Sequence, residues 1–83
     1  MTTKTTKQIY KEAFANFPTT FRKDKVIIRL GYKDAPENFM QYSVEKEARL
    51  VEILSFYKIR DFKREEIKDE NKYKMTRYIV NMA

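Results

Sequence analysis

Neither cysteine nor histidine occurs in this chain, so its 83 residues must fold without disulfide bonds or a zinc site. A chain this short buries only roughly 60% of the surface that its unfolded form exposes. Six phenylalanines and six tyrosines must supply much of the core, since each ring can bury on the order of 150 to 250 Å². With 42% hydrophobic and 36% charged residues, the composition indicates a single globular domain over residues 1–83, without a linker.

The same two absences restrict the chemistry. Without histidine or cysteine the chain has no imidazole base and no thiolate nucleophile, so we expect a binding protein rather than an enzyme, with no cofactor and no metal. The first residues are polar, and no run of apolar residues is long enough to cross a bilayer. These features predict a cytoplasmic protein without a membrane partner, and they leave the oligomeric state open.

The first third of the chain predicts a helix and then a strand. Thr5 and Gln8 have the spacing of a capping box, apolar residues follow at helical intervals, and Pro18 ends the helix. The segment from Val26 to Tyr32 is short and rich in β-branched residues, and apolar residues on both of its faces indicate an inner strand. Gly31, the only glycine, predicts a β-bulge or a close approach of another backbone segment.

Residues 33 to 43 leave two architectures open. If the segment from Phe39 to Ser43 pairs back on the strand before it, the elements follow the order α-β-β-α-β-β. This favoured arrangement is a small α+β domain whose antiparallel sheet packs against a buried central helix. If instead Asp34 caps a short helix with Glu37 three residues on, the order becomes α-β-α-α-β-β, which is winged-helix-like in its elements only.

The segment from Val44 to Tyr57 predicts the most regular helix, with Ser43 as its cap. Its apolar arc covers more than half of the circumference, which predicts a largely buried helix. The arc contains Val44, Ala48, Leu50, Val51, Ile53, Leu54 and Tyr57. Residues 61 to 82 then indicate two strands, of which the first, very polar arm is either an exposed edge or a continuation of helix.

The formal net charge of +6 is distributed unevenly along the chain. Residues 1–33 carry eight basic and two acidic side chains, residues 34–57 two and five, and residues 58–83 eight and five. The helix over residues 44–57 therefore lies in the one acidic block, and most of its surface is apolar. Such a helix is poorly suited to read bases in a DNA groove.

Two basic clusters outside that helix predict a regulatory protein that binds nucleic acid mainly through backbone phosphates. In the second cluster, tyrosines alternate with cations on a strand, as in proteins that stack rings on unpaired bases. Lysines on a sheet edge also prevent aggregation, and tyrosines are common at core boundaries, so a purely structural role explains the same pattern. The candidate contacts are Arg22, Lys23, Lys25, Arg29 and Lys33, and then Lys72, Tyr73, Lys74, Arg77 and Tyr78.

A second hypothesis is a protein-binding inhibitor or adaptor of the kind that phages and mobile elements encode. It would dock on an acidic or nucleic-acid-handling host protein. The chain is rich in aromatic residues and methionine, which are enriched in protein interfaces. The candidate interface residues are Phe21, Phe39, Met40, Phe56 and Phe62.

Two further kinds of site are disfavoured by the sequence. The acids Asp61, Glu65, Glu66, Asp69 and Glu70 match no metal-binding loop, and interspersed cations compensate them. A histidine-free ribonuclease would need lysine, arginine and tyrosine as acid, base and charge stabiliser. Its candidate residues are Tyr73, Lys74, Arg77 and Tyr78, whose spacing is not diagnostic.

Overall fold

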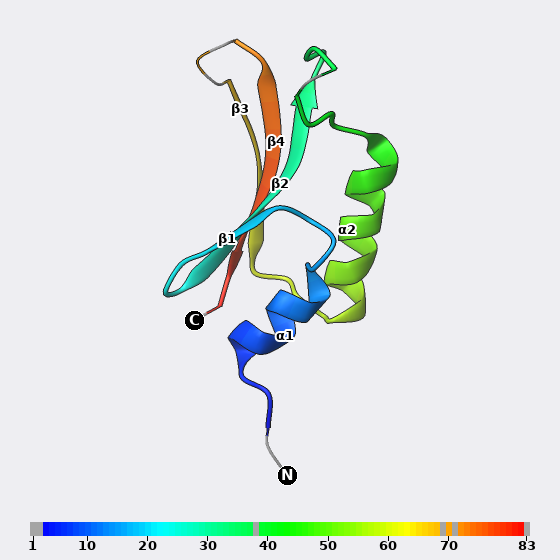
Figure 1. Cartoon of the computed structure of the whole chain (residues 1–83). Helices are drawn as coiled ribbons and strands as arrows, with labels where there is room; N and C mark the ends of the chain where they lie inside the picture. Colours follow the sequence, from blue (N-terminus) through cyan, green and yellow to red (C-terminus); the bar gives the residue numbers. More distant parts are fainter. Residues whose placement is uncertain (1–2, 38, 69, 71, 83) are drawn as a thin grey trace.

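The computed structural model describes residues 3–37, 39–68, 70 and 72–82. In chain order its elements are α1 (Thr6–Ala13), β1 (Thr19–Phe21), β2 (Lys25–Lys33), α2 (Val44–Phe56), β3 (Phe62–Lys68) and β4 (Lys74–Asn81). The four strands form one antiparallel sheet in the order β1-β2-β4-β3. The predicted α+β class and the order α-β-β-α-β-β are confirmed. Figure 1 shows α2 running alongside the sheet and α1 near the end of the molecule where both chain termini lie.

The partner of β2 differs from the predicted one. Residues 19–21 pair with β2, whereas Phe39 to Ser43 is not a strand and makes only a single parallel bridge, between Tyr32 and Gln41. Asp34, with a left-handed φ of 58°, turns the chain out of β2. No helix occurs in the described residues between β2 and α2, so the winged-helix-like alternative is wrong.

Both predicted helix caps are present. The Gln8 backbone N–H donates to Thr5 Oγ1 at 3.2 Å, and the Thr5 N–H donates to Gln8 Oε1 at 2.9 Å, which completes the capping box. The Ser43 side chain caps α2 by accepting from the backbone N–H of Lys46. α1 ends at Ala13, before Pro18, and the aromatic residues that follow it reach the core.

Gly31 serves both purposes that the sequence suggested. The β2–β4 register shifts between Arg29 and Gly31, so a bulge interrupts the pairing there. Gly31 has a φ of 118°, and a Cβ at this position would lie 2.7 Å from the carbonyl carbon of Gln41. Only glycine fits a backbone of this conformation so close to a neighbouring segment. The bulge also reverses the faces to which the later residues of β2 point.

One face of the sheet forms the core with both helices. Val26, Ile28 and Leu30 of β2 are fully buried there, against Leu50 and Leu54 of α2. Phe14 and Phe17 join this core from the segment after α1. Ile59, which follows α2, and Tyr78 and Val80 of β4 complete it. The sheet and the two helices thus form two layers, and the opposite face of the sheet lies outside this core.

The predicted extent of burial of α2 is wrong. Leu50 and Leu54 are its two buried residues, while Val44 is 71% and Val51 is 45% exposed, and Tyr57 beyond its end is 40% exposed. A helix packed on a single sheet buries only the stripe that faces the sheet. In this two-layer fold no further layer in the described residues covers the other side of α2.

Candidate nucleic-acid interface

The uncovered side of the sheet, here called the outer face, carries both of the predicted contact arginines that lie in strands, Arg29 and Arg77. In β2 the buried residues alternate with the half-buried Lys25, Ile27 and Arg29. In β4 the half-buried Arg77 and Ile79 alternate in the same way with buried residues. Successive residues of a strand point to opposite faces, so these side chains lie on the outer face. Lys63 and Glu65 of β3, which pair with Ile79 and Arg77, lie there too.

Two arginines lie directly opposite each other in this face. Arg29 pairs with Arg77 in the β2–β4 register, and like charges in such positions repel. Arg29 donates to Thr20 Oγ1, and Arg77 Nε donates to Glu65 Oε1 at 2.9 Å. The Arg77 hydrogen bond is the main reason why the pKa of Glu65 lies below its ordinary value. Among the outward-facing strand residues described, four are cations, Lys25, Arg29, Lys63 and Arg77, and one is an acid, Glu65, which pairs with Arg77 and Lys63.

The ends of the outer face differ in character. At one end the exposed Arg22, Lys23 and Asp24 lie in the turn between β1 and β2 and add one net positive charge. At the other end three half-buried rings pack edge to face: Tyr32 lies 5.5 Å from Phe39, and Phe39 lies 5.4 Å from Tyr73, measured between ring centroids. The face therefore combines cations with aromatic rings.

Sequence reasoning missed Tyr32, because the alternation of Ile28 and Leu30 would place it in the core. The bulge at Gly31 shifts this alternation by one residue, so Tyr32 pairs with Met75 on the outer face. The same shift moves Lys33 to the core side of the sheet, where its ammonium lies 5.1 Å from the centre of the Tyr42 ring. The lone glycine was the one signal in the sequence that could have revealed both changes.

Four of the predicted contacts do not join this face. Tyr78 is only 3% exposed and lies in the core, so its ring is not available for stacking. Lys33, Lys72 and Lys74 gather at the far end of the sheet, around a pocket that Tyr73 also lines. Arg77 and Tyr78 point to opposite faces, so the four residues considered for a ribonuclease are not brought together.

The hydroxyl of Tyr78 belongs to a hydrogen-bond network around Glu47 of α2. It donates to Glu47 Oε2 at 2.7 Å, Tyr42 donates to Glu47 Oε1, and Arg64 of β3 donates to both carboxylate oxygens. Mainly through the Arg64 hydrogen bond, and against the effect of burial, the pKa of Glu47 falls to about 2. Burial, followed by the bond to Glu47, raises the pKa of Tyr78 to about 12. This network ties α2 to two strands and is structural.

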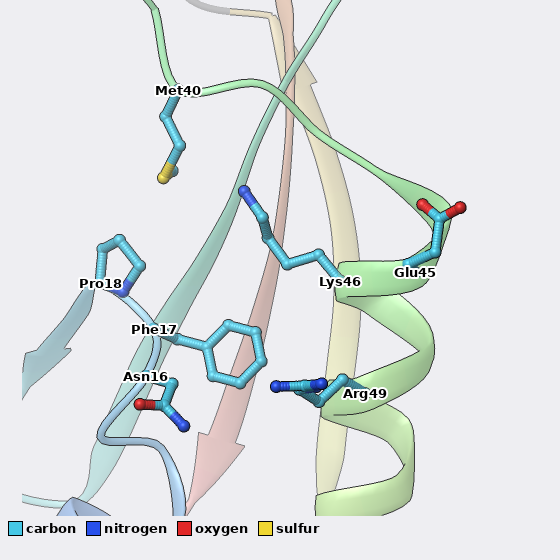
Figure 2. Close-up of a pocket in the computed structure, with 7 residues that line it drawn as sticks. All are labelled: Asn16, Phe17, Pro18, Met40, Glu45, Lys46 and Arg49. Atoms are coloured by element: carbon cyan, nitrogen blue, oxygen red, sulfur yellow. The ribbon is translucent and has the colours of Figure 1, made fainter.

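None of the five predicted protein-interface residues is buried. Phe56 is 79% and Phe62 is 38% exposed, while Phe21, Phe39 and Met40 are half-buried. Met40 also lines a pocket of about 470 Å³ between α2 and the segment before β1. Figure 2 shows the Phe17 ring near the centre, Pro18 next to it and Met40 above Pro18, while Lys46 and Arg49 reach in from α2 and Glu45 points away. The pocket thus has an apolar floor and a basic rim.

No family model matches the sequence, and neither a curated protein nor a solved structure matches it. Within the described residues, neither helix has the length and hydrophobicity that crossing a bilayer requires. Acidic side chains of the described residues form no group of three that could hold a metal ion. Glu65 and Glu66 point to opposite faces of β3, and Asp61 accepts from the side chain of Asn81 at 2.9 Å.

Proposed function

We propose that the protein binds nucleic acid through the outer face of its sheet, mainly by contacts to backbone phosphates and with little reading of sequence. The observation that carries this proposal is the excess of four cations over one acid among the outward-facing strand residues described, on a face outside the core. Two of them, Arg29 and Arg77, face each other across the strands although the contact is repulsive. A row of phosphates between them would relieve this repulsion.

A single strand fits this face better than a duplex. The guanidinium groups of Arg29 and Arg77 present planar donors that match phosphate oxygens. Tyr32, Phe39 and Tyr73 lie at the end of the same face, where unpaired bases can stack on aromatic rings. In a duplex the bases are already stacked, so the rings would contribute little.

Fluorescence anisotropy with a labelled single-stranded oligonucleotide of mixed sequence tests the proposal. We expect binding that weakens steeply between 50 and 200 mM salt, since for single strands log K falls by roughly 0.7 for each neutralised phosphate per tenfold rise in salt. The double variant R29Q/R77Q should lower that slope by about 1.4 if each arginine holds one phosphate.

The matched control is K7Q/K58Q, which removes the same charge from exposed positions away from the outer face. Thermal unfolding of each variant verifies that it is folded, and K25Q/K63Q gives a second test on the same face. Affinity that is independent of salt contradicts the proposal. So does an equal loss of binding in R29Q/R77Q and in the control.

Docking on a protein is a second candidate function, favoured by the pocket around Met40. An apolar floor with Lys46 and Arg49 at its rim would accept an apolar side chain of an acidic partner segment. A partner that copurifies with the protein after nuclease treatment should be lost with Met40→Asp and retained with Thr3→Asp, which adds the same charge elsewhere. Copurification that survives Met40→Asp would exclude this pocket as the docking site.

A further inference from the structure

Three lysines lie side by side across the sheet, at the end away from the chain termini. In the register of the strands Lys33 of β2 is opposite Lys74 of β4, and Lys74 is opposite Lys68 of β3. Directly opposite residues share a face, and neighbouring strands are roughly 4.8 Å apart, so three ammonium groups are attached within about 10 Å. Like charges in such positions destabilise a sheet.

Among the described residues, the carboxylate that forms ion pairs with this row is Glu66. Glu66 lies 3.4 Å from the Lys33 ammonium and 3.9 Å from the Lys74 ammonium, and it also accepts from Arg64 at 2.9 Å. The pKa of Glu66 is lowered, first by the Arg64 hydrogen bond and then by Lys33. Lys68 and Lys72 are exposed and form no ion pair within the described part of the chain.

The row opens on a pocket of about 360 Å³, here called the lysine pocket. Its described lining residues are Lys33, Asp34, Lys68, Lys72, Tyr73 and Lys74. Four of these six side chains are cationic and one is acidic. Lys72 adopts a left-handed φ of 67°, a conformation that costs roughly 1 kcal/mol or more for most residues other than glycine, whereas Asp34, with a φ of 58°, is of a residue type that tolerates it. Repulsion and backbone strain therefore meet at one place.

Protection of a sheet edge does not explain this arrangement. Lysines on edge strands prevent pairing with other chains, and Lys68 of β3 fits that role. Lys74, however, lies on β4, which is hydrogen-bonded to a strand on each side. A lysine there adds repulsion and protects no edge.

We propose that the lysine pocket binds a phosphate group that carries two negative charges. Lysine ammonium groups act as point charges with several donors each, so a group of them suits a compact dianion with three acceptor oxygens. The internal phosphodiester of a nucleic acid carries only one charge. Two sources could supply the dianion, the terminal phosphate of an oligonucleotide or a free polyphosphate. In the first case the inference rests on the proposed function, and in the second case it is independent of that function.

Calorimetric titration with pyrophosphate tests the pocket directly. We expect K68Q/K72Q to weaken binding at least tenfold, whereas K7Q/K58Q, which removes the same charge elsewhere, should leave it within about twofold. Binding of pyrophosphate that is equal in these two variants would overturn the inference, and so would its absence in the parent protein at low salt.

The repulsion in the row gives a second readout. Without ligand, Lys68→Glu should raise the midpoint of thermal unfolding by roughly 1 to 5 °C, because it places an acid opposite Lys74. The same variant should no longer be stabilised by pyrophosphate. If Lys68→Glu lowers the midpoint or retains the stabilisation, the lysines are not a strained phosphate site.

A pair of oligonucleotides separates the two sources and the two proposals. If the terminal phosphate is the ligand, an oligonucleotide with a 5′-phosphate or a 3′-phosphate should bind more tightly than its hydroxyl form, and K68Q/K72Q should abolish the difference. If pyrophosphate binds and neither oligonucleotide does, the outer-face proposal fails and the pocket stands, with free polyphosphate as its ligand. If both oligonucleotides bind equally and pyrophosphate does not bind, the pocket fails and the outer-face proposal stands.

Discussion

Replacement of Glu47 by glutamine tests whether its network holds α2 to the sheet. A fall in the pKa of this carboxyl from its ordinary 4.5 to about 2 means that the fold favours the charged form by about 3 kcal/mol. The Glu47 side chain is 15% exposed, but its main partner, Arg64, is 38% exposed, so solvent screening reduces this figure to about 2 kcal/mol. We expect Glu47→Gln to lose that much stability, and Glu47→Ala about 3 kcal/mol, because alanine leaves the buried hydroxyl of Tyr78 unpaired.

Urea unfolding at pH 7, followed by circular dichroism, measures these losses, and a loss of 2 kcal/mol corresponds to roughly 8 to 16 °C in thermal midpoint. Glu52→Gln is the matched control, because it makes the same change of charge at an exposed position of α2 and should stay within about 0.5 kcal/mol. Parent and Glu47→Gln curves that coincide at pH 7 would refute the reasoning.

The dependence on pH follows from the sign of the shift. A carboxyl whose pKa is lowered by folding stabilises the protein above the pKa of the unfolded chain. The advantage of the parent over Glu47→Gln should therefore be complete above about pH 4.5 and disappear as the pH falls towards 2. An advantage that does not change over this range would show that the Glu47 charge is not its source.

Three further outcomes are expected. The raised pKa of Tyr78 contributes stability that is complete below its ordinary pKa of 10 and is lost as the pH rises through about 12. The difference in urea midpoint between the parent and Tyr78→Phe should therefore change over that pH range and not below it. Gly31→Ala should cost at least about 2 kcal/mol by chemical denaturation, since it adds a clash to a left-handed backbone, and a neutral result would contradict the described bulge. Leu54→Ala should cost about 2 to 5 kcal/mol and Val51→Ala less than about 1 kcal/mol, whereas equal losses would mean that α2 is buried on both sides.

The sequence was sufficient for the fold where local chemistry decided the outcome. The capping box at Thr5 and Gln8, the cap at Ser43 and the inner strand β2 follow from short-range patterns, and the structure confirms them. The pairing of β2 could not be predicted in the same way. Residues 19–21 and 39–43 are both short, and which of them joins the sheet depends on tertiary contacts and on the turn at Asp34.

The candidate site was predictable in composition but not in geometry. Arg29 and Arg77 were selected by charge, and the strand register places them opposite each other. Tyr78 was selected because tyrosines alternate with cations over residues 72–78. The face of the sheet to which its side chain points, however, depends on the pairing of β4. A periodic pattern shows which residues share a face, but it does not show which face is covered. For α2 the apolar arc was wider than the stripe that the structure buries, because an apolar arc gives only an upper limit to the part of a helix that a single sheet can cover.

The placement of the two chain ends has a practical consequence. In Figure 1 the segment that leads into α1 and the end of β4 lie away from the β3–β4 hairpin, and the lysine pocket is built from residues beside that hairpin. An affinity tag, a fluorophore or a surface tether attached at either end would therefore project away from that pocket. The molecule can be immobilised on a sensor chip with its cationic tip directed towards the analyte.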